Sequence, residues 1–285
     1  MSAPSPSMYS DAARERATRL GLALGRPNLE EFAATLTQIA SEDRNVIVVT
    51  SDSRGSGKLV SFGQDLPRQL VEVGIAEQNL VGIAAGIAAT GKKVFAVSPA
   101  CFLTARALEQ IKADVAYADH PVVLVGISAG VSYGALGSTH HSLHDLAALR
   151  AINNVSIVVP ADNKETRAAV TYAAQADHPV YLRFGKAPMY HVRPSVTADQ
   201  INSAAVIRAG IDVAFVATGE AVIHALLAAE ELSDRSGISC RVISVPTLRP
   251  FDEALVLAAA RECKALITVE EHSLNGGLGE ACASL

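Results

Sequence analysis

Three histidines and one glutamate are the side chains whose types and spacing best suit proton-transfer chemistry in this chain. His140, His141 and His144 follow the turn-forming stretch SYGALGST, which comes after the apolar run VVLVGI. The ordinary pKa of histidine lies near neutrality, so such a cluster after a strand is typical of catalytic or substrate-binding groups. His140 and His144 also have the i, i+4 spacing of two metal ligands, but the sequence offers no third ligand beside them. We therefore expect no metal site in this chain.

Glu77 stands at the start of a predicted helix that continues as LVGIAAGIAA. A helix that is apolar on every side is buried, and Gly82 and Gly86 would let it pack closely against a neighbour. A carboxyl group at the head of such a helix is costly unless it has a partner or is protonated. Two interpretations stay open: an acid in the first turn favoured by the helix dipole, or a catalytic carboxyl group facing an apolar cleft.

Two further loops carry cationic or hydroxyl side chains that could bind an anionic group. The loop SDSRGSGKL over residues 51–59 offers Arg54 and Ser56. Arg183 lies near the end of the apolar run PVYLRF, and Lys186 follows this run. Each loop is also typical of a solvated turn, so neither indicates a site by itself.

The elements that must position these side chains alternate between strand and helix. Continuous runs of Val, Ile and Leu are separated by helical stretches, which predicts parallel sheets covered on both faces. Ligands of such sheets bind outside the carboxyl ends of the strands. We expect an α/β fold with two domains, each a mostly parallel sheet with helices on both faces. The strands are expected near residues 46, 94, 122, 155, 179, 212, 240 and 265, and helices over 11–25, 28–41, 103–117 and 164–175.

The length of 285 residues also favours two domains. We expect an N-terminal tail and helix over 1–27, a first domain over 28–190, a proline-containing linker over 191–205 and a second domain over 206–285. Asn28 and Glu31 suit a capping box that opens the first domain. The second domain shows only three strand signals, so we expect it to be incomplete.

Composition excludes several classes of protein. Hydrophobic residues make up 49% and charged residues 19%, with a mean hydropathy of +0.26, which excludes a disordered chain. The net charge is −5 and no basic block occurs, so neither a nucleic acid nor an anionic membrane is expected as a partner. Four scattered cysteines and the lack of an apolar leader or span predict a cytoplasmic protein. These cysteines are Cys101, Cys240, Cys263 and Cys282.

The motifs together resemble the transketolase family. The stretch VEVGIAEQNLVGIAAGIA resembles the segment of transketolase and deoxyxylulose-phosphate synthase whose glutamate contacts the aminopyrimidine ring of thiamine diphosphate. The resemblance continues in order over about residues 45–285, through GSTHHSLHDLAALR, VVPADNKET and VEEHSLNGGLGEA. It implies that the first domain is a pyrimidine-binding domain and the second a transketolase C-terminal domain.

The resemblance also implies roles for individual residues. Glu77 would hydrogen-bond N1′ of the aminopyrimidine and promote its imino tautomer, which removes the proton from the thiazolium C2 so that this carbon can attack a ketose carbonyl. Phe102 would pack on the pyrimidine ring, and Asp52 of the SD loop would contact the cofactor. His140 would lie near the hydroxyl and carbonyl groups of the sugar donor. The other substrate-binding residues would be Arg54, Ser56, Arg183 and Lys186.

Three positions depart from the family pattern. Leu136 stands where transketolases have the aspartate of DGxTH, which removes a carboxylate expected to bind the donor C2 hydroxyl. Ser128 and Ala129 stand where the family often has a phosphate-binding His or Arg. Lys186 replaces an arginine with a point charge that lacks the bidentate fork. We therefore expect substrates that differ from the usual pentose and hexose phosphates.

The sequence contains no GDG motif, which thiamine diphosphate enzymes use to hold magnesium and the diphosphate. The chain thus resembles the small subunit of a split transketolase that transfers a two-carbon ketol unit between sugars or sugar phosphates. A large N-terminal subunit would supply the GDG segment with Mg²⁺ or Ca²⁺, and pairing of the pyrimidine domains would give an α2β2 assembly.

Two alternatives remain. The β subunit of a 2-oxoacid dehydrogenase E1 has the same two-domain layout, but the GxTH block followed by DLAxLR favours transketolase. A catalytically silent subunit that only stabilises its partner would explain the altered phosphate positions, and the retained Glu77 argues against it.

Overall fold

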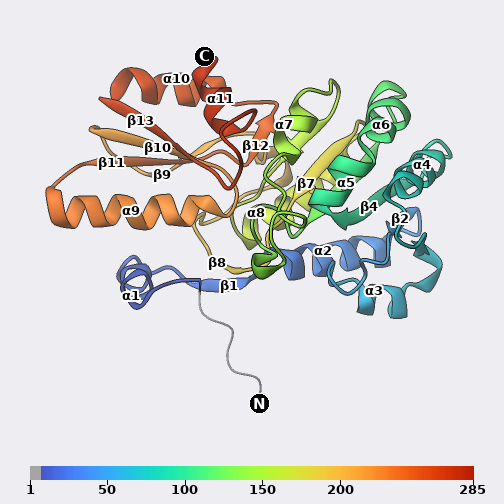
Figure 1. Ribbon diagram of the computed structural model, residues 1–285. Helices are drawn as coiled ribbons and strands as arrows, with labels where there is room; N and C mark the ends of the chain where they lie inside the picture. The colour runs from blue at the N-terminus through green and yellow to red at the C-terminus, as the bar shows by residue number, and fades with distance from the viewer. Residues whose placement is uncertain (1–7) are drawn as a thin grey trace.

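The computed structural model describes residues 8–285 as two packed α/β units, and the first seven residues of the predicted tail lie outside the described part. Figure 1 shows the units side by side, the larger sheet on the right and the smaller on the left. The α/β fold with two mostly parallel sheets, expected from the alternating strand and helix signals, is confirmed.

The larger sheet has seven strands in the order β12-β6-β7-β5-β4-β2-β3, all parallel except β12. Alternate residues of a strand point to opposite faces, so Val94 and Ala96 join one apolar core while Phe95 and Val97 join the other. This double burial is the reason why the strands read as continuous apolar runs. The strands are β2 (Val46–Thr50), β3 (Leu70–Glu72), β4 (Lys93–Pro99), β5 (Val122–Ile127), β6 (Ser156–Val158), β7 (Val180–Arg183) and β12 (Thr247–Arg249).

Helices cover both faces of this sheet. On one face lie α2 (Asn28–Glu42), α3 (Val60–Asp65) and α8 (Asn163–Gln175). On the other lie α4 (Glu77–Ala88), α5 (Ala100–Arg106), α6 (Leu108–Gln110) and α7 (Asp145–Arg150). The single helix expected over 103–117 is instead a broken series, because α5 ends at Arg106 and the chain continues through α6 into a π-helix, η2 (Ile111–Tyr117).

The smaller sheet has four strands in the order β13-β10-β11-β9. Helices α9 (Ala221–Ser236) and α1 (Asp11–Arg19) lie on one face, and α10 (Glu253–Glu262) and α11 (Leu278–Ala283) on the other. The sequence analysis found three of these strands and missed the antiparallel β9, which begins inside the predicted linker. The strands are β9 (Ala205–Arg208), β10 (Val213–Ala217), β11 (Cys240–Ser244) and β13 (Ala265–Val269).

The strand β12 ties the two units together. The predicted strand that starts at residue 240 is in fact two, because the chain turns after Ser244 and Thr247 pairs with Val158 of the larger sheet. Val159 N–H also donates to the carbonyl of Pro246 at 2.7 Å. A segment from the second unit therefore completes the edge of the first sheet.

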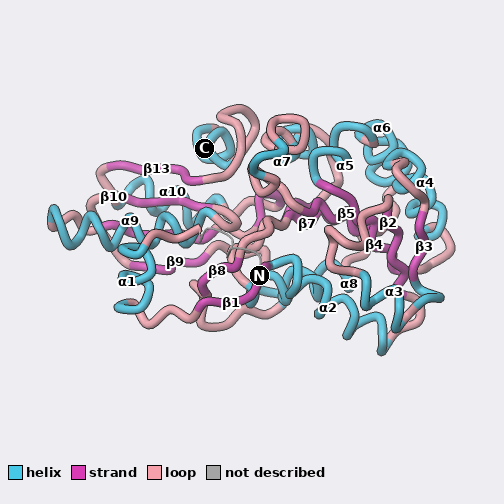
Figure 2. Tube along the Cα trace, turned by 60° about the horizontal axis from the view of Figure 1, so that its bottom comes forward, coloured by secondary structure: helices cyan, strands magenta, loops and turns pink. Residues whose placement is uncertain are grey.

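The N-terminal segment differs from its prediction in two ways. The helix expected over 11–25 ends at Arg19, and β1 (Leu24–Pro27) pairs antiparallel with β8 (Pro188–Tyr190), as Figure 2 shows. The capping box is wrong, because no side chain caps α2 and the Glu31 carboxylate instead binds Arg26 at 2.6 Å and Arg167 at 2.8 Å.

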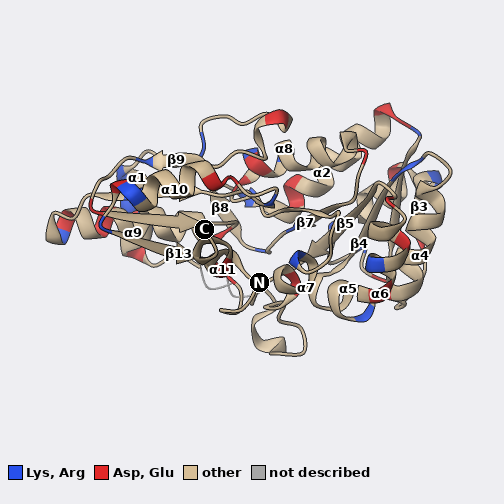
Figure 3. Cartoon of the chain, turned by 90° about the horizontal axis from the view of Figure 1, so that it is seen from above, with Lys and Arg blue, Asp and Glu red and all other residues tan. Residues whose placement is uncertain are grey.

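The surface charges of both signs are interspersed along the helices and loops (Figure 3). Within residues 8–285, no helix has the length and apolar character needed to cross a lipid bilayer.

Candidate functional site

The residues singled out in the sequence lie at or after the carboxyl ends of β2, β3, β4, β5 and β7, with Glu77 following β3. These strands are neighbours and parallel, so their loops meet at one edge of the sheet. The loop 51–59 follows β2, Phe102 lies in α5 directly after β4, His140 lies in the long loop after β5, and Lys186 follows β7.

Glu77 is buried, with 3% of its surface exposed, and is the first residue of α4. Its Oε2 accepts a hydrogen bond from Nη1 of Arg106 at 2.9 Å, and the Arg106 side chain is about half-exposed. The guanidinium carbon of Arg106 also lies 4.5 Å from the centre of the Phe102 ring. The carboxylate thus has both the cationic partner that its burial requires and the favourable end of a helix dipole.

His140 lies between two aromatic rings. Its ring centre is 5.2 Å from that of Phe102 and 5.3 Å from that of Tyr133, both in edge-to-face geometry. Its Nδ1 is 3.0 Å from Oγ1 of Thr139. The side chains Glu77, Arg106, Phe102, His140 and Tyr133 therefore form one continuous row of contacts, which brings the predicted carboxyl, aromatic and imidazole groups together.

Tyr133 extends this row towards Lys186, whose Nζ lies 4.7 Å from the centre of its ring. Burial raises the pKa of Tyr133, and the neighbouring hydroxyl groups of Ser128 and Ser56 oppose that shift. The Oγ atom of Ser128 is buried and has no hydrogen-bond partner of normal geometry among the described residues.

Asp52 and Arg54 lie beside a different hollow. They line a cavity of about 400 Å³ next to α3. Asp52 has a left-handed backbone with φ of 54°, and its N–H donates to Oε1 of Glu72 at 2.6 Å. Burial opposes the charged form of Glu72, but bonds from Asp52 N–H, the Thr50 hydroxyl and Gly74 N–H outweigh it and lower its pKa. Arg54 Nε lies 3.4 Å from the same carboxylate, so Glu72 fixes this loop.

The side chain of Arg183, for which a substrate-binding role is predicted, is engaged by groups inside the protein. Its guanidinium is 7% exposed and donates to Oδ2 of Asp145 at 2.7 Å, to the carbonyl of Ser142 at 3.0 Å and to the carbonyl of Glu271 at 2.9 Å. Burial raises the pKa of Asp145, but the charge of Arg183 and its hydrogen bonds more than offset this and lower it. This geometry favours a structural role, in which Arg183 joins the histidine loop to the second unit.

The three histidines do not form a metal centre in this structure. His144 is exposed at the start of α7, and Nε2 of His141 lies 3.0 Å from the carbonyl of Gly134. Over residues 8–285, no three His, Cys, Asp or Glu side chains are grouped so that they could hold a metal ion.

Comparison with known protein families matches both units. Residues 29–190 match the model described as "Transketolase, pyrimidine binding domain" and residues 202–285 the model "Transketolase, C-terminal domain". The chain belongs to the transketolase family. Transketolases use thiamine diphosphate, so the family implies this cofactor for the present chain.

Several transketolase relatives are close in sequence and length. An apulose-4-phosphate transketolase subunit of Phocaeicola vulgatus is 45% identical over 251 residues, which cover 88% of this chain and 80% of that protein. The 6-deoxy-6-sulfo-D-fructose transketolase subunit SqwH of a Clostridium species is 35% identical over 254 residues, covering 89% and 79%. A solved structure described as a split-gene transketolase in an inactive β4 tetramer superposes with a TM-score of 0.83 at 35% identity, covering 91% and 84%.

The row of contacts is consistent with the transketolase cofactor. A carboxylate, a half-buried aromatic ring and an imidazole lie together at the strand ends of a pyrimidine-binding domain. These three groups are the ones needed to bind a protonatable heteroaromatic ring. Glu77 and Phe102 are the residues that would hold such a ring.

The sequence analysis missed several residues that shape this candidate site. Arg106 stands four residues after Phe102 on a helix, so the i, i+4 spacing was a signal that could have found it. Glu220 and Glu271 follow the carboxyl ends of β10 and β13, where the rule for parallel sheets also applies. Tyr133 had no signal, because its place depends on the path of an irregular loop.

Proposed function

We propose that this chain is the small subunit of a heteromeric, thiamine diphosphate-dependent transketolase that moves a two-carbon ketol unit between sugars or sugar phosphates. The observation that carries the proposal is the buried Glu77, paired with Arg106 and next to the row Phe102–His140–Tyr133. The names of the relatives support it, since the proteins from Phocaeicola vulgatus and Clostridium are both described as single subunits of a transketolase.

Each side chain of the row has a distinct task in this proposal. Bound thiamine diphosphate supplies the carbon nucleophile for attack on the ketose carbonyl. Glu77 holds and moves a proton at N1′ of the pyrimidine, and Arg106 keeps the carboxylate of Glu77 in place. Phe102 provides an apolar wall for the ring, and His140 exchanges hydrogen bonds with the donor's hydroxyl and carbonyl oxygens.

The remaining predicted residues keep their assignments as part of the proposal, with one exception. Lys186 and Ser56, both beside Tyr133, would bind the distal part of the sugar. Asp52 would contact the cofactor and Arg54 the substrate from the neighbouring cavity. Arg183 is left out, because its guanidinium is already used within the protein. Because Lys186 offers a point charge where the family has an arginine fork, we propose a substrate that differs from the usual pentose and hexose phosphates.

The proposed assembly includes a large subunit and a second copy of this chain. The large subunit would carry the GDG motif and hold the diphosphate with Mg²⁺ or Ca²⁺. Helix α4 is not buried on every side as expected, since Asn79 and Gly86 are exposed and Gly82 and Ile83 only half-buried. Ile75, just before this helix, is 73% exposed. Pairing of two pyrimidine domains would cover this apolar stripe and give α2β2.

The proposed domain boundaries are 28–190 for the pyrimidine-binding domain, 191–205 for the linker and 206–285 for the C-terminal domain. The transketolase relatives favour this function over the E1 β-subunit interpretation. The intact ion pair of Glu77 favours it over a silent subunit.

The test is reconstitution with a partner chain that carries the GDG motif, in the presence of thiamine diphosphate and Mg²⁺. We expect ketol transfer from a ketose donor by the mixed complex and none by either chain alone. Activity of the partner alone at the level of the complex would support a silent subunit instead.

A further inference from the structure

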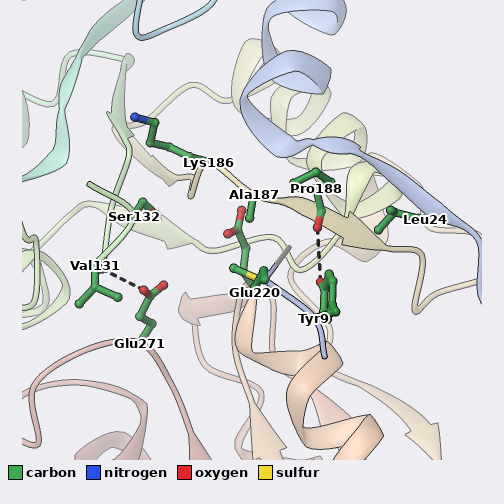
Figure 4. Close-up of a pocket in the computed structure, with 10 residues that line it drawn as sticks. Tyr9, Leu24, Val131, Ser132, Lys186, Ala187, Pro188, Glu220 and Glu271 are labelled. Atoms are coloured by element: carbon green, nitrogen blue, oxygen red, sulfur yellow. Dashed lines mark hydrogen bonds between the residues drawn. The ribbon is translucent and has the colours of Figure 1, made fainter. Parts of the chain in front are cut away.

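A cavity of about 720 Å³ lies where the C-terminal domain meets the substrate-facing loops of the pyrimidine-binding domain. Figure 4 shows that Glu220 and Glu271 rise into it from the C-terminal domain, towards Val131, Ser132 and Lys186 of the other domain. Both glutamates follow the carboxyl ends of parallel strands, β10 and β13. Neither has a role in the proposed proton transfer, so their placement needs a separate explanation.

Glu271 holds the loop that carries Tyr133. Its Oε1 accepts a hydrogen bond from the N–H of Val131 at 2.9 Å. Gly130 precedes Val131 with φ of +61°, and a Cβ atom at this position would overlap the Glu271 carboxylate. The carboxylate therefore fills a gap that exists only because residue 130 is glycine. Two residues further along the chain is Tyr133, which packs against His140.

Glu220 repeats this arrangement on the loop that carries Lys186. Its Oε1 accepts hydrogen bonds from the N–H of Gly185 at 3.1 Å and from Nδ2 of Asn28 at 3.2 Å. A Cβ atom at Gly185 would overlap Oε2 of Glu220. The next residue is Lys186, whose Nζ lies over the ring of Tyr133.

We propose that Glu220 and Glu271 are positioning residues through which the C-terminal domain fixes the two substrate-facing loops, 130–133 and 185–186, and thereby sets the affinity for the sugar substrate. This inference rests on the proposed function. The loop after β5 is rich in glycines with positive φ, at Gly130, Gly134 and Gly137, so its ordering carries a large entropy cost. Hydrogen bonds from a backbone N–H to a carboxyl oxygen offset part of that cost.

The environment of Glu220 suggests a conservative replacement. Burial, and then the charge of Glu271, raise the pKa of Glu220 to about 8, so this side chain carries its proton at neutral pH. Its carbonyl oxygen still accepts the bond from Gly185 N–H. Glutamine has the same shape and also offers a carbonyl oxygen, so Glu220→Gln should keep the contact while Glu220→Ala removes it.

The first arm of the test is amide hydrogen exchange in the full chain, which requires no partner and no activity. Glu220→Ala should speed the exchange of the Gly185 amide about tenfold, and Glu271→Ala that of the Val131 amide, as expected for one lost hydrogen bond of this kind. Glu220→Gln should keep the wild-type rate. Glu253→Ala, which changes an exposed glutamate of the same domain, is the matched control and should change neither amide.

The second arm measures kinetics of the reconstituted complex. Glu220→Ala and Glu271→Ala should raise KM for the ketose about tenfold with kcat within twofold of wild type, and Glu220→Gln should restore the wild-type KM. If one alanine variant unfolds, the other alanine variant carries the test, because each glutamate binds a different loop. Unchanged exchange at both amides, or an unchanged KM despite faster exchange, would overturn the inference. Absence of ketol transfer in the wild-type complex would overturn the proposed function instead, and the inference with it.

Discussion

Replacing Glu220 with glutamine should change the way in which the stability of this protein depends on pH. The pKa of Glu220 is raised to about 8 by burial and by the charge of Glu271, against interactions with Asn28, Gly185 N–H and Arg183 that lower it. In the unfolded chain the pKa of this carboxyl group returns to its ordinary value of 4.5. The folded protein therefore binds a proton at pH 6 that the unfolded chain does not, and stability falls as the pH rises from about 4.5 towards 8.

The size of the effect follows from the two pKa values. Each pH unit between them costs about 1.4 kcal/mol of unfolding free energy. Between pH 6 and pH 9 the wild-type chain should thus lose about 2.5 kcal/mol through this one group, since the loss levels off above the folded pKa. Glu220→Gln cannot ionise and lacks this loss. The difference in unfolding free energy between variant and wild type should therefore move by about 2.5 kcal/mol in favour of the variant over that pH range.

Urea unfolding of the full chain at pH 6, 7.5 and 9 measures this difference directly. Comparison with wild type at each pH removes the contribution of all other titrating groups. Glu253→Gln, at an exposed position, should give a difference that does not vary with pH. A constant difference for Glu220→Gln as well would refute the reasoning, because it would mean that Glu220 is ionised in the folded protein at neutral pH.

Three further predictions concern the proposed complex. His140→Ala should spare exchange of the cofactor's C2 proton, followed by NMR. It should lower turnover with a ketose about 10²–10³-fold, the loss typical of removing one hydrogen-bond donor that faces the reacting oxygen. Equal loss of proton exchange and turnover would place His140 at the pyrimidine. The isolated chain should bind thiamine diphosphate poorly because it has no GDG motif, and micromolar binding by calorimetry without a partner would contradict the split-subunit proposal. Ile83→Asp should shift light scattering of the chain towards the monomer, since it puts a charge into the half-buried stripe of α4, whereas the exposed Gln78→Asp should not.

Much of the fold follows from local patterns in the sequence. The strand β4 is predictable because both of its faces are covered, which makes its central residues apolar on each side. The strands β3 and β9 lie at sheet edges and are only partly buried, so they lack the continuous apolar run that marks the equally short β6 and β7. The strand β12 pairs with the sheet of the other domain. Such pairings depend on tertiary contacts that no local pattern encodes.

The candidate site likewise contains residues that the sequence pattern indicates and residues whose roles depend on tertiary contacts. Glu77 could be singled out because a carboxyl group beside an apolar helix conflicts with its surroundings. The ion pair of Arg183 with Asp145 could not be predicted, because the sequence pattern of an arginine at the end of a strand is the same whether the side chain faces a ligand or a buried aspartate. The roles of Glu220 and Glu271 depend on gaps at Gly185 and Gly130 that only the folded chain reveals.

The central claim is that Glu77 drives proton transfer at the cofactor, and exchange of the C2 proton for deuterium in the reconstituted complex tests it most directly. Proton NMR follows this step without any sugar substrate, so it separates cofactor activation from substrate binding. Glu77→Ala should slow the exchange about 10²–10⁴-fold. Thermal unfolding should show that the variant stays folded, because its partner Arg106 is half-exposed and can be hydrated. Exchange at the wild-type rate in a folded Glu77→Ala complex would show that Glu77 is structural and would contradict the account.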